Sequence, residues 1–185
     1  MNHSDLVRLL EGAVGDAGAR WADLGAGQGA FTMALAELVG PRSHITAVDR
    51  DARALSGIGE EMARRFPGVT VTTMAADFTR PLNLEGLDGV LMANSLHFVR
   101  DKQPVLKSVR GMLRPQGRLI MVEYGADRGN PWVPHPFSYA SWERMAAQAG
   151  FEGTMLLRTI PSRHLGSIYS AVSFLGELRP GSEDL

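Results

Sequence analysis

The stretch Asp23-Leu24-Gly25-Ala26-Gly27-Gln28-Gly29 lies between a short apolar run and a segment with helical composition. Residues 20–24 predict a β-strand, and residues 30–39 predict an α-helix that ends before Gly40-Pro41. Glycines between a strand and a helix permit a tight turn and let a ligand approach the backbone closely. Open α/β sheets bind ligands at this carboxyl edge of their strands, so the stretch is the first candidate for a binding site.

Strand-like and helix-like segments alternate along most of the chain. Further strands are predicted over residues 44–48, 69–74, 89–93, 118–123, 151–159 and 167–175, and further helices over residues 51–66, 104–113 and 141–149. This alternation predicts an α/β fold, a Rossmann-like sheet that is mostly parallel and has helices on both faces. The loop 161–166 is too short for a crossover helix, so the last of the seven strands should pair antiparallel.

Composition places the chain among ordinary globular proteins. It has 185 residues, of which 44% are hydrophobic and 21% charged, so a single domain over residues 1–176 is expected. An amphipathic helix, capped by Ser4 or Asp5, is expected near the start of this domain. Residues 177–185 are polar and are expected to form a flexible C-terminal tail.

Charge and hydropathy argue against several classes of partner. The formal net charge is −1, which disfavours sequence-independent binding to nucleic acid. No stretch has the length and apolar character of a membrane span, and the first residues lack the pattern of a signal peptide. The chain has no cysteine, which excludes disulfides and zinc–thiolate sites. We therefore expect a cytoplasmic protein without a membrane or nucleic-acid partner.

Asp49 is the second candidate, because it follows the second predicted strand, with Arg50 beside it. A carboxylate there can accept hydrogen bonds from the ribose hydroxyls of an adenosine, or it can cap the following helix. S-adenosylmethionine and NAD both contain adenosine, and Gly25-x-Gly27-x-x-Ala30 also satisfies the dinucleotide fingerprint. Asp23 favours the first ligand, because its charge would repel a pyrophosphate and attract an ammonium or a sulfonium.

Taken together, these motifs resemble those of the class I S-adenosylmethionine-dependent methyltransferases over roughly residues 20–175. Asp23-x-Gly25-x-Gly27-x-Gly29 has the form of that family's first motif, and Asp49 is similar to its acidic residue after the second strand. The resemblance implies a seven-stranded sheet with an antiparallel seventh strand. It also implies S-adenosylmethionine as the cofactor and methyl transfer as the reaction.

Three more residues take a role from this resemblance. Asp77 and Phe78 follow the third strand and are similar to the segment that holds the adenine, while Asn94 is similar to the residue whose backbone carbonyl meets the methionine ammonium. Asp77 could instead cap a turn before Pro81, and Phe78 could belong to the core. The implied cofactor site comprises Asp23, Gly25, Ala26, Gly27, Asp49, Arg50, Asp77, Phe78 and Asn94.

The substrate side is less well defined by the sequence. Methyl transfer from a sulfonium needs a general base only where the nucleophile must lose a proton. His97 is the predicted catalytic residue. Alternatively, it could begin the next helix, or its ring could be hydrogen-bonded by the backbone. Further candidates are Glu123, Tyr124 and His135. No His, Asp and Glu cluster has the spacing of metal ligands, so no metal is expected.

The acceptor and the assembly remain open. Residues 124–139, rich in proline and aromatic residues, could wall a pocket for an apolar or aromatic molecule or could dock onto the core. Because few residues precede Asp23, the site is expected to be open or completed by a second subunit of a homodimer. Asn94-Ser95-Leu96-His97 departs from the Asn/Asp-Pro-Pro-Tyr/Phe signature of amide and adenine methylation. We expect a small-molecule acceptor. The alternatives are an NAD(P)-dependent oxidoreductase and a non-catalytic methyltransferase-like binding module.

Overall fold

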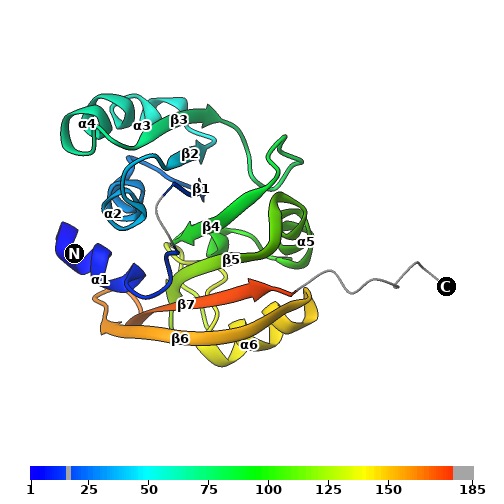
Figure 1. Ribbon diagram of the computed structural model, residues 1–185. Helices are drawn as coiled ribbons and strands as arrows, with labels where there is room; N and C mark the ends of the chain where they lie inside the picture. Colours follow the sequence, from blue (N-terminus) through cyan, green and yellow to red (C-terminus); the bar gives the residue numbers. More distant parts are fainter. Residues whose placement is uncertain (16–17, 177–185) are drawn as a thin grey trace, which may run out of the picture.

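The computed structural model describes residues 1–15 and 18–176, which form a seven-stranded sheet with helices on both faces (Figure 1). The predicted tail 177–185 lies outside the described residues. The strands are β1 (Arg20–Leu24), β2 (His44–Asp49), β3 (Thr70–Ala75), β4 (Leu87–Ala93), β5 (Leu113–Tyr124), β6 (Phe151–Pro161) and β7 (Ser167–Leu175). The helices are α1 (His3–Leu10), α2 (Ala30–Val39), α3 (Ala52–Leu55), α4 (Ile58–Arg65), α5 (Gln103–Met112) and α6 (Tyr139–Gln148), with a short 3-10 helix η1 (Leu96–Phe98).

The strand order is β3-β2-β1-β4-β5-β7-β6. The first five strands in this order are parallel, and β7 is antiparallel to both β5 and β6. The predicted α/β class and the antiparallel seventh strand are therefore confirmed. From β1 the order proceeds outward to β2 on one side and to β4 on the other. Open sheets form their ligand crevice at such a switch point.

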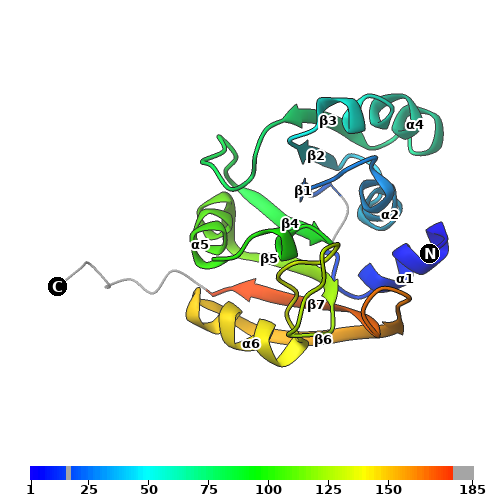
Figure 2. The same ribbon diagram turned by 180° about the vertical axis from the view of Figure 1, so that it is seen from behind.

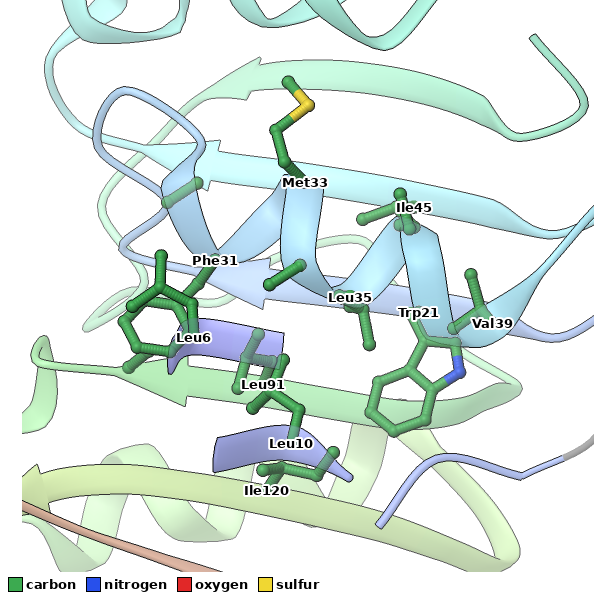
Figure 3. Packing of buried hydrophobic residues seen from close by; sticks show 14 of the residues in the cluster. Leu6, Leu10, Trp21, Phe31, Met33, Leu35, Val39, Ile45, Leu91 and Ile120 are labelled. Carbon is green, nitrogen blue, oxygen red and sulfur yellow. The ribbon is translucent and has the colours of Figure 1, made fainter. Parts of the chain in front are cut away.

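Two hydrophobic cores fix the sheet between its helices. One core packs α1, α2, α3 and α4 against one face, and the other packs α5 and α6 against the opposite face, as the reverse view in Figure 2 also shows. Figure 3 shows the first of these cores, where Leu10 of α1, Leu35 of α2 and Ile120 of β5 are fully buried. Burial of each such side chain stabilises the fold by about 1.5–3 kcal/mol.

Several element boundaries differ from the sequence prediction for local reasons. The cap of α1 is Asn2, not Ser4 or Asp5, although the Asp5 carboxylate accepts from the Asn2 amide to complete a capping box. The predicted helix 51–66 is broken at Ser56-Gly57 into α3 and α4. The Ser56 hydroxyl donates to the Arg53 carbonyl, and glycine is a poor helix former, so the two together interrupt the helix.

Two further differences lie on the α5 and α6 side of the sheet. β5 begins at Leu113 rather than at residue 118, because Pro115-Gln116-Gly117 forms an irregularity within the strand instead of a separate turn. α6 begins at Tyr139 with Ser138 as its N-cap, whereas the sequence suggested Ser141. No helix of the described residues has the length and apolar character needed to cross a membrane.

Candidate functional site

A cavity of about 510 Å³ lies at the carboxyl ends of β1, β2, β3 and β4. Its wall includes six of the residues predicted for the cofactor site: Gly25, Asp49, Arg50, Asp77, Phe78 and Asn94. Seven further residues of the wall were not predicted for it: Asp51, Ala54, Ala76, Thr79, Ser95, Phe98 and Val99. Within the described chain, Asp23, Ala26, Gly27 and His97 are not part of this wall.

The glycine turn after β1 is held by both neighbouring strands. The amides of Gly25 and Ala26 donate to the Val48 carbonyl of β2 at 2.8 and 2.9 Å. On the other side, the Ser95 hydroxyl donates to the Leu24 carbonyl at 2.7 Å. Gly25 has a φ of +87°, and a Cβ there would lie 2.4 Å from the Cβ of Ser95. Only glycine satisfies both constraints, so this residue lets β1 and β4 approach each other beside the cavity.

Replacing Gly25 by alanine is expected to lower the free energy of unfolding by about 2–5 kcal/mol, since left-handed strain adds to a steric clash. Gly27→Ala is the matched control, because Gly27 has a φ of +53° but faces open space. It should cost only about 1–2 kcal/mol, from strain alone. Urea denaturation of both variants measures the difference. Equal destabilisation would contradict a close approach of Ser95 to Gly25.

Asp49 joins the end of β2 to the glycine turn. Its Oδ2 accepts from the Gly27 amide at 2.8 Å, and its Oδ1 accepts from the Asp51 amide at 2.9 Å. The N-cap of α3 is Asp51, whose carboxylate accepts from the Arg53 amide, so the helix-cap alternative applies to Asp51 and not to Asp49. A carboxylate has about four lone-pair sites, which leaves Asp49 able to accept from a ligand as well.

Asp77 and Phe78 form the wall of the cavity after β3. The Thr79 hydroxyl and amide both donate to Asp77 Oδ1, at 2.7 and 2.9 Å, and these bonds hold the pKa of Asp77 below its ordinary value. Asp77 therefore shapes a turn and presents a carboxylate to the cavity. Phe78 is half-buried, packs against the second core and also lines the cavity, so both of its proposed roles are compatible with its placement.

Asn94, directly after β4, carries two signs of a binding residue. Its φ is +51°, a left-handed conformation that non-glycine residues adopt uncommonly and that clusters at functional sites. Its side-chain Oδ1 is buried and has no hydrogen-bond partner among the described residues. Because an unpaired buried acceptor costs about 1–3 kcal/mol, Asn94 is held in an unfavourable arrangement of the kind that clusters at functional sites.

Asp23 lies beneath the glycine turn, away from the cavity wall. Its side chain is 1% exposed and accepts a hydrogen bond of 2.6 Å from the Thr32 hydroxyl. Burial raises the pKa of Asp23 to about 7, the bond from Thr32 opposes this rise, and the charge of Asp49 adds to it. Its charge therefore depends on pH near neutrality, and it would act on a ligand across the turn and not by direct contact.

The raised pKa of Asp23 gives stability a pH dependence. Between pH 5 and 7 the folded chain holds this proton while the unfolded chain has released it, so the contribution of Asp23 to stability is greatest at low pH and falls as pH rises. Relative to Asp23→Asn, the free energy of unfolding of the unsubstituted chain should fall by about 1.4 kcal/mol per pH unit and level off above pH 7. Urea denaturation of both proteins from pH 5 to 8 measures this change. A difference in the free energy of unfolding that stays constant over this pH range would contradict the raised pKa of Asp23.

His97 and Glu123 form a buried pair behind the cavity. Glu123 Oε2 accepts from His97 Nδ1 at 2.8 Å, and Glu123 Oε1 accepts from the His97 amide at 3.1 Å. Both side chains are at most 3% exposed. The His97 ring contacts the ring of Phe98, which lines the cavity, with centroids 4.2 Å apart. Both residues were candidates in the sequence analysis, but no local pattern predicted that they form a pair, because they are 26 residues apart in the chain.

The proline-rich loop after β5 is anchored to this pair and does not form the cavity wall. The His135 amide donates to the His97 carbonyl at 3.0 Å. Phe137 is buried against Trp142 and Tyr169, which agrees with the docking alternative for this loop. Trp132, in contrast, is 79% exposed.

The cavity suits an adenosyl ligand that carries positive charge. Its volume falls within the range of about 300–1,000 Å³ that is typical of small-molecule sites. Three carboxylates and one guanidinium lie in its wall, from Asp49, Asp51, Asp77 and Arg50. Such a wall attracts an ammonium or a sulfonium and disfavours a diphosphate. Asn94 follows β4 at this wall, and the resemblance assigns its backbone carbonyl to the ammonium group. The residues present therefore fit S-adenosylmethionine.

Comparisons with known proteins agree with this geometry. Residues 16–154 match the profile of a family described as a methyltransferase domain. The chain is 28% identical over 130 residues to the ubiquinone/menaquinone biosynthesis C-methyltransferase UbiE of Hahella chejuensis, covering 70% of this chain and 52% of UbiE. It is 26% identical over 165 residues to the highly reducing polyketide synthase pspA of Penicillium soppii, covering 73% of this chain and 6% of the synthase. The chain thus spans about half the length of UbiE.

Solved structures show the same fold at low sequence identity. A SAM-dependent methyltransferase from Aquifex aeolicus superposes with a TM-score of 0.66 and 16% identity, covering 95% of this chain and 99% of that one. The CurJ carbon methyltransferase superposes with a TM-score of 0.71 and 18% identity, covering 91% of this chain and 51% of that one. The family match over residues 16–154 shows that this chain belongs to the methyltransferase-domain family, with the class I fold for which S-adenosylmethionine is the cofactor.

Proposed function

We propose that this chain transfers the methyl group of S-adenosylmethionine to a carbon atom of a small-molecule acceptor, with His97 as the general base. The observation that carries the proposal is the buried His97–Glu123 pair directly behind the cavity. Two of the similar proteins support carbon as the methylated atom. UbiE is named a C-methyltransferase, and the CurJ structure is that of a carbon methyltransferase. Family membership decides against the NAD(P)-dependent alternative.

The cofactor would be held by residues that line or underlie the cavity. When bound, S-adenosylmethionine supplies an electrophilic methyl group on a sulfonium. Asp49 would accept from the ribose hydroxyls, and Asp77 with Phe78 would hold the adenine. Asn94 would receive the ammonium group, with the charge of Asp23 beneath the turn as electrostatic support. Four of these residues line the same cavity, and Asp23 lies beneath the glycine turn beside it.

The His97–Glu123 pair suits the removal of a proton from carbon. Glu123 is an acceptor, so the proton of the neutral His97 ring lies on Nδ1 and leaves Nε2 as the basic nitrogen. Nε2 would take the proton from the acceptor carbon, which keeps the electron pair and becomes the nucleophile. The carboxylate of Glu123 then stabilises the resulting imidazolium. The His97 ring contacts Phe98, which lines the cavity, so the acceptor would reach Nε2 from the side of Phe98.

Transfer of a labelled methyl group tests this proposal. The full chain is incubated with S-adenosylmethionine carrying a ¹³C methyl group and with a metabolite extract of the source organism. We expect the label in a product whose methyl carbon is coupled to another carbon and not to oxygen or nitrogen. Label found only in O-methyl or N-methyl groups would overturn the carbon assignment. No transfer despite intact cofactor binding would support the non-catalytic alternative.

The same proposal includes a cytoplasmic location and assembly as a homodimer. The absence of cysteine is consistent with a reducing compartment. Cell fractionation and sedimentation equilibrium test the two statements, and a strictly monomeric chain at working concentration would contradict the second.

A further inference from the structure

A row of aromatic rings begins at the cavity and continues across the carboxyl edge of the sheet. Phe98, which lines the cavity, contacts the His97 ring at a centroid distance of 4.2 Å. The His97 ring contacts Tyr124 edge-on at 5.5 Å, and Tyr124 contacts His164 edge-on at 6.3 Å. The four rings come from η1, from the end of β5 and from the β6–β7 loop. Segments far apart in sequence thus build one continuous row.

The row presents aromatic surface to solvent at its two ends. Phe98 is 61% exposed, which is unusual for a large apolar side chain, and His164 is also exposed. Tyr124 is half-buried between them, and His97 is buried beneath. Phe98 thus places exposed aromatic surface at a ligand cavity, which is typical of a binding surface.

We propose that Phe98, Tyr124 and His164 form the acceptor-binding surface, and that the acceptor is a planar, conjugated and largely apolar molecule. This inference rests on the proposed carbon methylation, because Phe98 and Tyr124 both contact the ring of the proposed base His97. A flat ligand would extend from the cavity at Phe98 toward the β6–β7 loop. It would meet some of these rings by the face and others by the edge, because Tyr124 is nearly perpendicular to His97 and to His164. In the following text these three residues are called the aromatic surface.

The chemistry of carbon methylation also favours an acceptor that becomes planar when it loses its proton. A carbon gives up a proton to a histidine only where the resulting charge spreads over a conjugated system, and such a system is flat. Flat rings stack on or against other aromatic rings with an energy beyond that of simple apolar burial. The proton leaves a tetrahedral carbon bonded to that system, and the aromatic surface complements the flat anion that results.

A pair of ring compounds tests whether planarity matters. The probe is 2-naphthol, and its saturated analogue decahydro-2-naphthol has the same carbon skeleton without the planar rings. The full chain, saturated with S-adenosylhomocysteine, is titrated with 2-naphthol and followed by the fluorescence of the probe. We expect saturable binding that decahydro-2-naphthol fails to displace at equal concentration. Displacement by the saturated analogue at equal concentration would overturn the planar specificity.

Variants test the location of the surface. Phe98→Leu keeps an apolar side chain and His164→Asn keeps a polar one, but both remove a ring, and each should weaken 2-naphthol binding about three- to tenfold. Trp132→Leu is the matched control, since Trp132 is exposed and aromatic but takes no part in the ring contacts of this row. It should leave 2-naphthol binding unchanged. Equal losses in Trp132→Leu and Phe98→Leu, or no loss in either row variant, would overturn the inference.

The titration separates this inference from the proposed function. Each protein is also titrated with S-adenosylhomocysteine alone. Absence of cofactor binding in the unsubstituted chain would overturn the proposed function and with it the aromatic surface. Normal cofactor binding together with no binding of 2-naphthol would overturn only the aromatic surface.

Discussion

Replacing His97 by alanine should lower turnover by about 10²–10⁴-fold, the range typical of a lost general base. Affinity for S-adenosylhomocysteine should stay unchanged, because His97 is not part of the cavity wall in the described chain. Turnover is measured with the acceptor identified by labelled methyl transfer, and affinity is measured by calorimetric titration. A loss of cofactor binding would remove His97 from its substrate-side role.

A second variant separates base chemistry from structure. His97→Ala leaves the Glu123 carboxylate buried without its partner, which can destabilise the fold by about 3–5 kcal/mol. His97→Gln can still donate to Glu123 but has no basic nitrogen. It should keep a near-normal melting temperature and lose turnover to a similar extent. Normal turnover in His97→Gln would show that the pair only holds the end of β5 against η1.

Replacing Asp49 by alanine should weaken S-adenosylhomocysteine binding by about 1.5–3 kcal/mol, the range for a hydrogen bond to a charged group. This corresponds to about tenfold to 150-fold in the dissociation constant. Asp49 is the acidic residue that both lines the cavity and holds the Gly27 amide, so its loss removes a ligand acceptor and loosens the glycine turn.

Asp88→Ala provides a matched control for the loss of a carboxylate. Asp88 pairs with Arg114 and accepts from the Arg20 amide at the start of β1, the end of this strand away from the cavity. Its removal should leave the dissociation constant unchanged. The dissociation constant of Asp49→Asn should lie between those of Asp88→Ala and Asp49→Ala, because the amide keeps one acceptor oxygen but no charge. An unchanged constant in Asp49→Ala would remove this residue from the cofactor site.

The fold was largely predictable because its strands are buried in a simple pattern. Residues 89–93 of β4 form a continuous apolar run, since helices cover this strand on both faces, and the glycine turn after β1 marks the switch point of the sheet. The helix 51–66 was harder, because Ser56-Gly57 interrupts a segment whose composition otherwise favours one helix. One or two residues are enough to interrupt a helix, whereas the periodicity of apolar residues is judged over a longer window and does not detect them.

The site was only partly predictable because much of it depends on contacts between distant segments. Asp49, Asp77 and Asn94 each end or follow a strand, so strand order alone brings them together. Phe98 lines the cavity from η1, a short helix that the sequence analysis did not predict. The pairing of His97 with Glu123 and the burial of Asp23 likewise follow from tertiary packing, for which a single sequence carries no local signal.

A crystal structure of the full chain with S-adenosylhomocysteine tests the central claim most directly. The account predicts that the ligand occupies the cavity at the ends of β1 to β4. Its ribose hydroxyls should lie within hydrogen-bond distance of the Asp49 carboxylate, and its amino-acid end should lie beside Asn94. A ligand bound elsewhere, or Asp49 turned away from the ribose, would contradict the account.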